Sequence, residues 1–157
     1  MKFADFVCSD AIIAKLEATD RDGAIAELVS ALVRAGRLKK PLCDDVIKAV
    51  IRRENEASTG MGKGIAIPHV KHGAVRDVVG AIGQTSSGID FAALDKQPVY
   101  SVILLVSPLN NPDRHLQAME SIFRHLQHDR FRKFLRQAQT VEQIIDLLQE
   151  ADESPSL

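Results

Sequence analysis

The stretch VYSVILLV, Val99–Val106, is apolar nearly throughout and rich in β-branched residues. A strand that is half exposed alternates between apolar and polar residues, and this stretch does not. It therefore predicts a strand that is buried on both faces. A sheet with such a strand at its centre needs helices on both sides, which indicates the α/β class.

The segments on either side of Val99–Val106 read alternately as helices and strands. The spacing of apolar residues predicts helices from about Thr19 to Gly36, from after Pro41 to Arg52-Arg53, from about Asp113, over Phe131–Gln137, and from Thr140 to Leu148. Short apolar runs predict strands over Ala11–Ala18, Ile65–Ile67 and Val75–Gln84, with a turn-rich connection from Ser86 to Pro98. Because strands and helices alternate and no long linker separates them, we expect one domain over residues 1–150 and a flexible tail over 151–157.

Three local details of these helices can be predicted. Thr19 or Asp20 can cap the first helix, and TVEQ, starting at Thr140, has the spacing of a capping box. In the helix from about Asp113, a helical stripe of apolar side chains is expected to face inward: Leu116, Met119, Ile122, Phe123 and Leu126.

The composition excludes several classes of function. The chain has 157 residues, 45% of them hydrophobic and 26% charged, with a formal net charge of −1, so no global field attracts nucleic acid or acidic lipid. Cys8 and Cys43 have neither zinc-ligand spacing nor a disulfide framework. No apolar run approaches the roughly 20 residues of a membrane span, and the N-terminal residues lack a signal-peptide pattern. We expect a cytoplasmic protein without a membrane span.

The segment STGMGKGIAIPHVKH, Ser58–His72, carries the chemistry. Backbone N–H groups of Gly60, Gly62 and Gly64, with the hydroxyls of Ser58 and Thr59, can bind an anion. Neither the P-loop spacing nor the dinucleotide-binding spacing of glycines fits this segment. Those two phosphate-binding motifs are therefore excluded.

A histidine follows the glycines at the end of the short strand. A neutral imidazole at His69 is a competent nucleophile, and Arg53 upstream can bind phosphoryl oxygens with two nitrogens. Together these groups predict a phosphoryl-transfer site that needs no metal or other cofactor. The alternative is structural: glycines before a strand often form only a tight loop, and a single histidine is often without catalytic function.

The sequence RENEASTGMGKGIAIPHVK, Arg53–Lys71, resembles the active-site segment of the enzyme IIA proteins of the phosphoenolpyruvate-dependent phosphotransferase system, in the fructose/mannitol class. IIAKLEATDRDGAIAELVSAL, Ile12–Leu32, is similar to the opening of these proteins, as is MKFADF before it. LLVSP followed by HLQAM, from Leu104 to Met119, is similar to their second landmark. The resemblance covers most of the chain.

The resemblance implies a mixed central sheet with helices on both faces and a phosphohistidine intermediate. It implies that His69 accepts the phosphoryl group from HPr or an HPr-like carrier, that Arg53 binds its oxygens, and that His115 is a second active-site histidine. Two positions depart from the family pattern, which usually has glycine at each: Ala57, expected to restrict the turn slightly, and Val70, expected to narrow the approach of a partner or change which partner docks.

Three roles fit this family. Because no IIB or membrane component follows before Leu157, the stand-alone nitrogen-regulatory type is favoured. The alternatives are a sugar-specific IIA that passes the group to a IIB component, and a regulatory module without a phosphoryl acceptor that binds target proteins according to its phosphorylation state.

The remaining charged and titratable residues predict no further site. His69, His72 and His115 lack the cysteine or carboxylate partners of a zinc site, and His72, past the strand end, is expected to be exposed. The basic residues Arg124, Arg130, Arg132, Lys133 and Arg136 are read as a solvated helix face.

Overall fold

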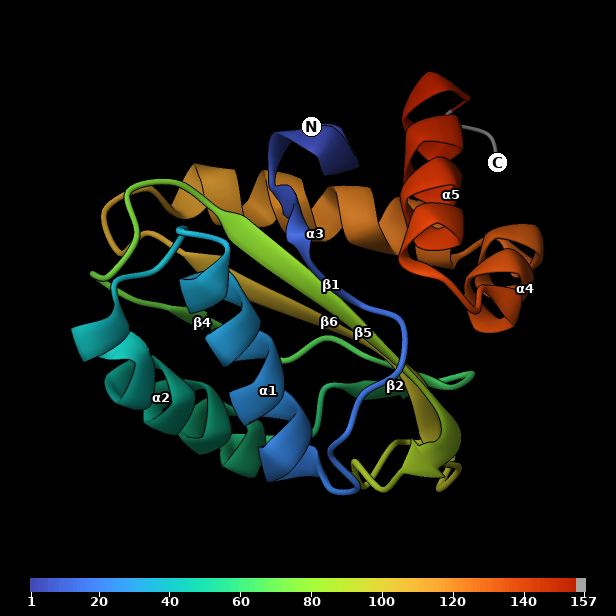
Figure 1. Ribbon diagram of the computed structural model, residues 1–157, viewed down its shortest axis with the longest axis horizontal. Helices are drawn as coiled ribbons and strands as arrows, with labels where there is room; N and C mark the ends of the chain where they lie inside the picture. Colours follow the sequence, from blue (N-terminus) through green and yellow to red (C-terminus); the bar gives the residue numbers. More distant parts are fainter. Residues whose placement is uncertain (155–157) are drawn as a thin grey trace.

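A six-stranded mixed sheet crosses the middle of the molecule, with helices on both faces (Figure 1). A computed structural model describes residues 1–154 of the chain. The strands are β1 (Val7–Ile13), β2 (Gly60–Gly62), β3 (Ile65–Ala66), β4 (His69–Lys71), β5 (Val79–Ile89) and β6 (Val99–Ser107). The helices are α1 (Arg21–Arg34), α2 (Cys43–Glu56), α3 (Pro112–Leu126), α4 (Asp129–Gln137) and α5 (Val141–Glu153), with short 3₁₀ turns η1 (Phe3–Asp5) and η2 (Lys40–Leu42).

The strand order is β1-β5-β6-β3-β2, and β4 continues the same edge of β6 beyond β3. β1 runs parallel to β5, and β5 antiparallel to β6. β3 and β4 both run parallel to β6, while β2 pairs antiparallel with β3. The predicted α/β fold with a mixed central sheet is therefore confirmed.

Strand β6 is buried on both faces, as its sequence predicts. Val102, Leu104 and Val106 belong to a core formed with α1 and α2, whereas Ile103 and Leu105 belong to a second core formed with α3, α4 and α5. Because successive side chains of a strand point to opposite faces, one apolar run supplies both cores.

Helix ends agree with the capping signals in the sequence. Asp20 caps α1 by accepting a hydrogen bond from the Gly23 amide, and Gly36 follows that helix with a φ of 75°. Thr140 and Gln143 form the expected capping box of α5. Within residues 1–154, none of the helices is long and apolar enough to cross a membrane.

Two strands lie elsewhere than predicted. β1 spans Val7–Ile13 instead of Ala11–Ala18, and its pairing with β5 extends from Val7 to Ile13. β5 begins at Val79 and continues through the polar residues Thr85–Ser87 to Ile89. Val75 and Val78 are buried residues of the loop that precedes the strand. The predicted strand thus started too early, because apolar residues of the preceding loop were read as part of it. It ended too early because the polar residues after Gln84 were read as a turn.

The inward face of α3 was also predicted wrongly in part. Ile122 and Leu126 are buried and Met119 packs partly, but Leu116 is 57% exposed and Phe123 is 37% exposed. Ala118 and Ser121 are buried in their place, and the Ser121 hydroxyl donates to the carbonyl of Met1 at 2.8 Å. Because these side chains are small, the apolar pattern did not mark them as part of the buried face.

The C-terminal helix continues further than expected. α5 extends to Glu153, and Ala151 is fully buried. The Asp152 carboxylate accepts hydrogen bonds from the amides of Phe3 and Ala4, at 2.7 and 3.0 Å, so α5 is joined to the N-terminal turn. Of the expected tail, residues 155–157 lie outside the described part of the chain.

Candidate active site

Strand β4 places His69 beside His115. His69 pairs with Leu105 of β6 and lies on the face of the sheet that α3 covers. His115 is in the first turn of α3, and the two imidazole centroids are 5.5 Å apart, with the rings tilted by 40°. The structure therefore brings together two histidines that are 46 residues apart in the sequence.

The protonation of His69 follows from its hydrogen bond. Its Nδ1 lies 2.8 Å from the carbonyl oxygen of Ile67, which can only accept, so Nδ1 carries the proton. Burial lowers the pKa of His69; the Ile67 hydrogen bond opposes this, and the positive charges of Arg53 and Lys71 add to it. The ring is neutral at pH 7, with the lone pair on Nε2.

His115 is held by a buried serine. Ser107, at the end of β6, is fully buried, and its Oγ lies 2.7 Å from Nδ1 of His115. Burial lowers the pKa of His115 to about 4, and the nearby His69 and Lys71 contribute to this shift. Sequence reasoning missed Ser107. It occupies the position after Ile103 and Leu105 on the same face of the strand, and only that alternation could have indicated it.

Arg53 lies near His69, in the last turn of α2. Its Nη1 donates to the carbonyl oxygen of Ala57 at 3.1 Å, and its charge is close enough to lower the pKa of His69. Ala57 has a φ of −163°, extended backbone that any residue adopts. The expectation that Ala57 restricts this turn is therefore wrong.

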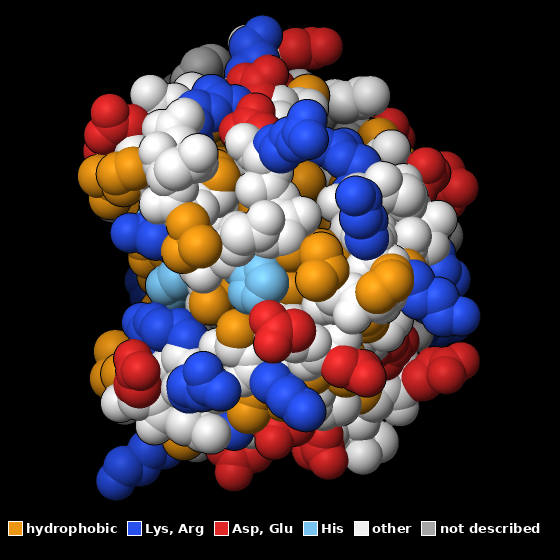
Figure 2. All heavy atoms as spheres, turned by 90° about the vertical axis from the view of Figure 1, so that its left-hand side faces the viewer, with side chains coloured by type: hydrophobic (Ala, Val, Ile, Leu, Met, Phe, Trp, Pro, Cys, Tyr) orange, Lys and Arg blue, Asp and Glu red, His pale blue; other side chains and the backbone are white. Residues whose placement is uncertain are grey.

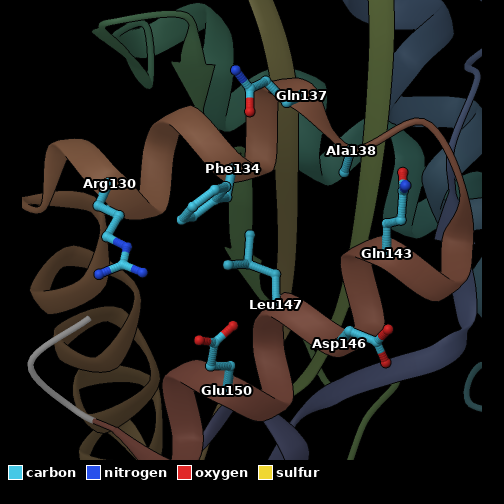
Figure 3. A pocket seen from close by; sticks show the side chains of 8 residues that line it. All are labelled: Arg130, Phe134, Gln137, Ala138, Gln143, Asp146, Leu147 and Glu150. Atoms are coloured by element: carbon cyan, nitrogen blue, oxygen red, sulfur yellow. The ribbon is translucent and has the colours of Figure 1, made fainter.

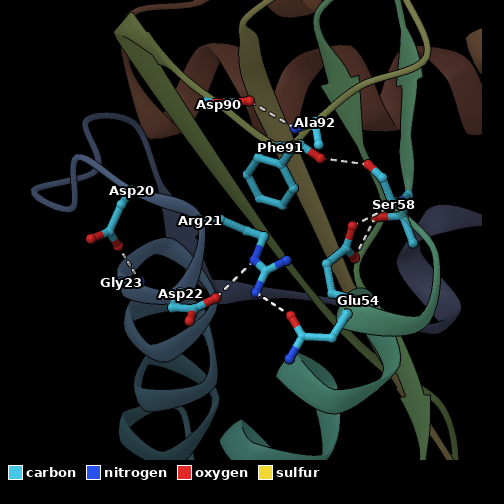
Figure 4. Close-up of polar contacts among 11 residues, drawn as sticks. Asp20, Arg21, Asp22, Gly23, Glu54, Ser58, Asp90, Phe91 and Ala92 are labelled. Carbon is cyan, nitrogen blue, oxygen red and sulfur yellow. Dashed lines mark hydrogen bonds and ion pairs between the residues drawn. The ribbon is translucent and has the colours of Figure 1, made fainter. Parts of the chain in front are cut away.

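The two hydroxyls before the glycines are bonded within the protein. The Ser58 hydroxyl donates to the carbonyl of Phe91 at 2.5 Å (Figure 4). It also accepts from the Gly60 amide. The Thr59 hydroxyl and amide donate to the carboxylate of Glu54, at 2.7 and 2.5 Å. Glu54 is only 2% exposed and was not identified from the sequence, because α2 was expected to end before it. These bonds fix the chain next to the predicted site.

The glycines do not form one cradle around His69. Gly60 and Gly62 belong to β2, and the carbonyl of Gly64 accepts from the amides of Tyr100 and Ser101 near the start of β6. His69 pairs with Leu105. At about 3.3 Å per residue, Gly64 and His69 are roughly 16 Å apart along β6. Thr59, by contrast, accepts from the Ile67 amide and is near His69.

Val70 points away from His69. It follows His69 in β4, so its side chain lies on the opposite face, where it packs against the core of α1 and α2. Val70 therefore does not narrow the space over His69 on the face that carries His69, and its effect on which partner docks stays a prediction. His72 is not exposed either: its side chain is 17% exposed and bonds through Nε2 to Asp45 of α2 at 2.5 Å.

The surface around the histidines is apolar and bordered by charge. Figure 2 shows histidine side chains at the surface among hydrophobic side chains, with basic and acidic groups around them. Leu116 directly follows His115, and Leu109 precedes α3; they are 57% and 63% exposed. Exposed leucines beside a reactive group are suited to docking another protein.

Comparison with known proteins identifies the family. Residues 5–151 match the family described as "Phosphoenolpyruvate-dependent sugar phosphotransferase system, EIIA 2". The chain belongs to this family. It is a phosphotransferase component, a phosphocarrier of the EIIA type-2 class.

Its relatives divide between two roles. A fructose-specific EIIA component of Haloferax volcanii is 35% identical over 85% of both chains. A nitrogen regulatory protein of Bradyrhizobium diazoefficiens is 30% identical over 94% of this chain and 95% of its own. A fructose-specific EIIABC component of Bacillus subtilis is 31% identical over 97% of this chain, which spans only 24% of that protein.

Solved structures share the fold. The nitrogen regulatory protein IIA-Ntr of Neisseria meningitidis superposes with a TM-score of 0.83 at 26% identity, covering 93% of this chain and 98% of its own. The IIA mannitol enzyme of Escherichia coli, solved in complex with phosphorylated IIB, has a TM-score of 0.73 at 21% identity, over 90% and 95% of the two chains.

Proposed function

We propose that His69 of this EIIA type-2 protein accepts a phosphoryl group on Nε2 from the phosphohistidine of HPr or an HPr-like carrier. The observation that carries the proposal is the hydrogen bond from Nδ1 to Ile67, since it leaves the Nε2 lone pair for attack. In the transfer, that lone pair forms the new P–N bond while the P–N bond of the donor breaks and its electrons return to the donor imidazole.

Positive and neutral groups around His69 suit a bound phosphoryl group. Arg53 and Lys71 supply positive charge, and a neutral His115 can donate a hydrogen bond from its ring N–H to a phosphoryl oxygen. Arg53 has to leave or share the carbonyl of Ala57 to reach the phosphoryl oxygens. Ser58 and Thr59 hold the chain in place, and Thr59 contributes no free hydroxyl, because Glu54 binds it.

We assign the protein to the nitrogen-regulatory type, acting in the cytoplasm on regulatory target proteins. The end-to-end similarity to the nitrogen regulatory protein of B. diazoefficiens and the likeness to IIA-Ntr of N. meningitidis support this role. The second candidate is a sugar-specific IIA that passes the group to a IIB component, which the Haloferax volcanii relative favours. A regulatory module without any acceptor is the third.

Phosphoryl uptake tests the site. We expect the purified protein, incubated with phosphoenolpyruvate, enzyme I and HPr, to gain the mass of one acid-labile phosphoryl group. His69→Gln should gain none. His72→Gln, a matched control three residues away, should be phosphorylated like the wild type. Uptake by His69→Gln would refute the assignment of the nucleophile.

Transfer onward separates the roles. The phosphorylated protein is mixed with fructose-type and mannitol-type IIB domains, and loss of its phosphoryl group is followed by intact mass. Retention of the group with every IIB supports the regulatory type. Rapid loss to one IIB supports the sugar-specific type and overturns our assignment of the role.

A further inference from the structure

A polar cavity of about 580 Å³ lies beside the C-terminal end of α4. Its lining residue Gln84 pairs with Ser101 near the start of β6, whereas His69 pairs with Leu105 further along that strand. Its walls are the three residues that follow β1, residues 84–87 of β5, and the end of α4 with the first residues of the α4–α5 connection. The lining includes Lys15, Thr85, Ser86, Ser87, Arg136 and Gln137. Its volume is in the range of small-molecule sites.

We propose that this cavity binds a small phosphorylated sugar or polyol. Two cations, three hydroxyls and side-chain amides line it, and among the described residues no lining residue is acidic. A guanidinium and an ammonium recognise a phosphate group, whereas hydroxyls and amides pair with the hydroxyls of a sugar.

Hydrogen bonds of Gln84 connect the walls of the cavity. The buried Gln84 side chain accepts from the Ser101 hydroxyl and donates to the carbonyl of Leu135 in α4. Its backbone carbonyl accepts from the Leu16 amide at 2.8 Å. One residue of β5 therefore joins the two other walls, and little ordering cost remains for a ligand.

Arg136 is held by an aromatic ring. Its Cζ lies 3.4 Å from the centroid of the Tyr100 ring, and that ring fits against Gly64 and Gly88, where a Cβ would come within 3.3 Å or less of its neighbours. A stacked guanidinium keeps the edge of its plane free for a bidentate contact with a phosphate.

A neighbouring cleft has an arginine over an aromatic ring as well, but it is lined by carboxylates. It is about 410 Å³ in volume and lies between α4 and α5, with Arg130 and Phe134 on one side and Asp146 and Glu150 on the other (Figure 3). Arg130 lies over the ring of Phe134 at 5.4 Å, much as Arg136 lies over Tyr100. The two carboxylates make this cleft unsuitable for a phosphate, so Arg130 serves as a matched control on the same helix.

The sole tyrosine of the chain is the probe, since the sequence has no tryptophan. Glucose 6-phosphate should change the fluorescence of Tyr100 and shift the backbone amide resonances of Thr85–Ser87, whereas glucose and inorganic phosphate should act much more weakly. We expect Arg136→Gln and Lys15→Gln each to weaken binding about tenfold, as the loss of a charge-assisted hydrogen bond does. Arg130→Gln should bind like the wild type.

Three outcomes would overturn the proposal. They are no response to glucose 6-phosphate at millimolar concentration, an equal response to glucose or to inorganic phosphate, and equal weakening by Arg130→Gln. Because Lys15 is exposed, its variant tests the site even if Arg136→Gln disturbs the fold. His69→Gln should bind the sugar phosphate normally, so this result does not depend on the phosphoryl-transfer proposal.

Discussion

At the scale of single residues, the site depends on histidines that resist protonation. Burial is the largest cause that lowers the pKa of both, and the neighbouring His69 adds to the shift of His115, whose pKa falls to about 4. In the proposed transfer a protonated His69 would have no lone pair to attack phosphorus, so a low pKa keeps Nε2 available. The phosphoryl group would then bring negative charge close to the positive charges of Arg53 and Lys71.

The depressed pKa of His115 makes folding stability depend on pH. In the unfolded chain the imidazole takes up a proton near pH 6.5, whereas in the folded protein it does so only near pH 4. The unfolded state therefore binds more protons between these values, and stability falls as the pH falls from 6.5 to 4. We expect a loss of about 2 kcal/mol from His115 over this interval, measured by urea unfolding.

His115→Asn is the control for that measurement. Asparagine cannot titrate but can still bond to Ser107, so the variant should lose the part of the pH dependence that comes from position 115. A curve with the same slope as that of the wild type would show that His115 is not the group responsible.

At the scale of elements, Glu54 joins the end of α2 to the start of β2. Its buried carboxylate binds both the amide and the hydroxyl of Thr59. Glu54→Gln keeps the shape but replaces one acceptor by a donor, so we expect a loss of about 1–3 kcal/mol in unfolding free energy. Phosphoryl uptake by His69 should slow as well, because Thr59 pairs with Ile67 beside the nucleophile.

Glu56→Gln is the matched variant for this test. Glu56 ends the same helix but is exposed. It should leave both stability and uptake unchanged. If the two glutamine variants behave alike, Glu54 does not position the site.

The sequence predicts well those elements whose own residues carry a local pattern, such as an apolar run or a capping box. β6 is identified by its continuous apolar run, and α5 by its capping box. β1 and β5 were misplaced because their ends depend on pairing with each other and with β6, which no local pattern contains. The face of α3 was misjudged because Ala118 and Ser121, small residues with little apolar area, belong to its buried face.

At the scale of the whole molecule, the site residues that stand in local motifs could be predicted, whereas those that depend on contacts between distant segments could not. His69, Arg53 and His115 stand in recognisable motifs, and the structure places the first and last side by side. Ser107 and Glu54 act through partners in other segments, so only the fold reveals them. The three glycines are close together in the sequence, but Gly60 and Gly62 lie in β2 and Gly64 bonds to the start of β6, whereas His69 pairs further along that strand. No spacing rule could have shown this.

Helix α5 is joined to the N-terminal turn η1, and this contact should contribute to global stability. Asp152 of α5 accepts hydrogen bonds from the amides of Phe3 and Ala4, while Phe3 itself is buried against Phe131 and His125. Asp152→Asn replaces one carboxylate oxygen by a donor that cannot accept from an amide, so we expect unfolding free energy to fall by about 1–2 kcal/mol in urea unfolding at pH 7. Glu153→Gln, which is exposed and next in the helix, should have no effect. Equal stability of the two variants would mean that the C-terminal turn of α5 contributes little to the unfolding free energy. That result would agree with the prediction of a flexible tail from residue 151.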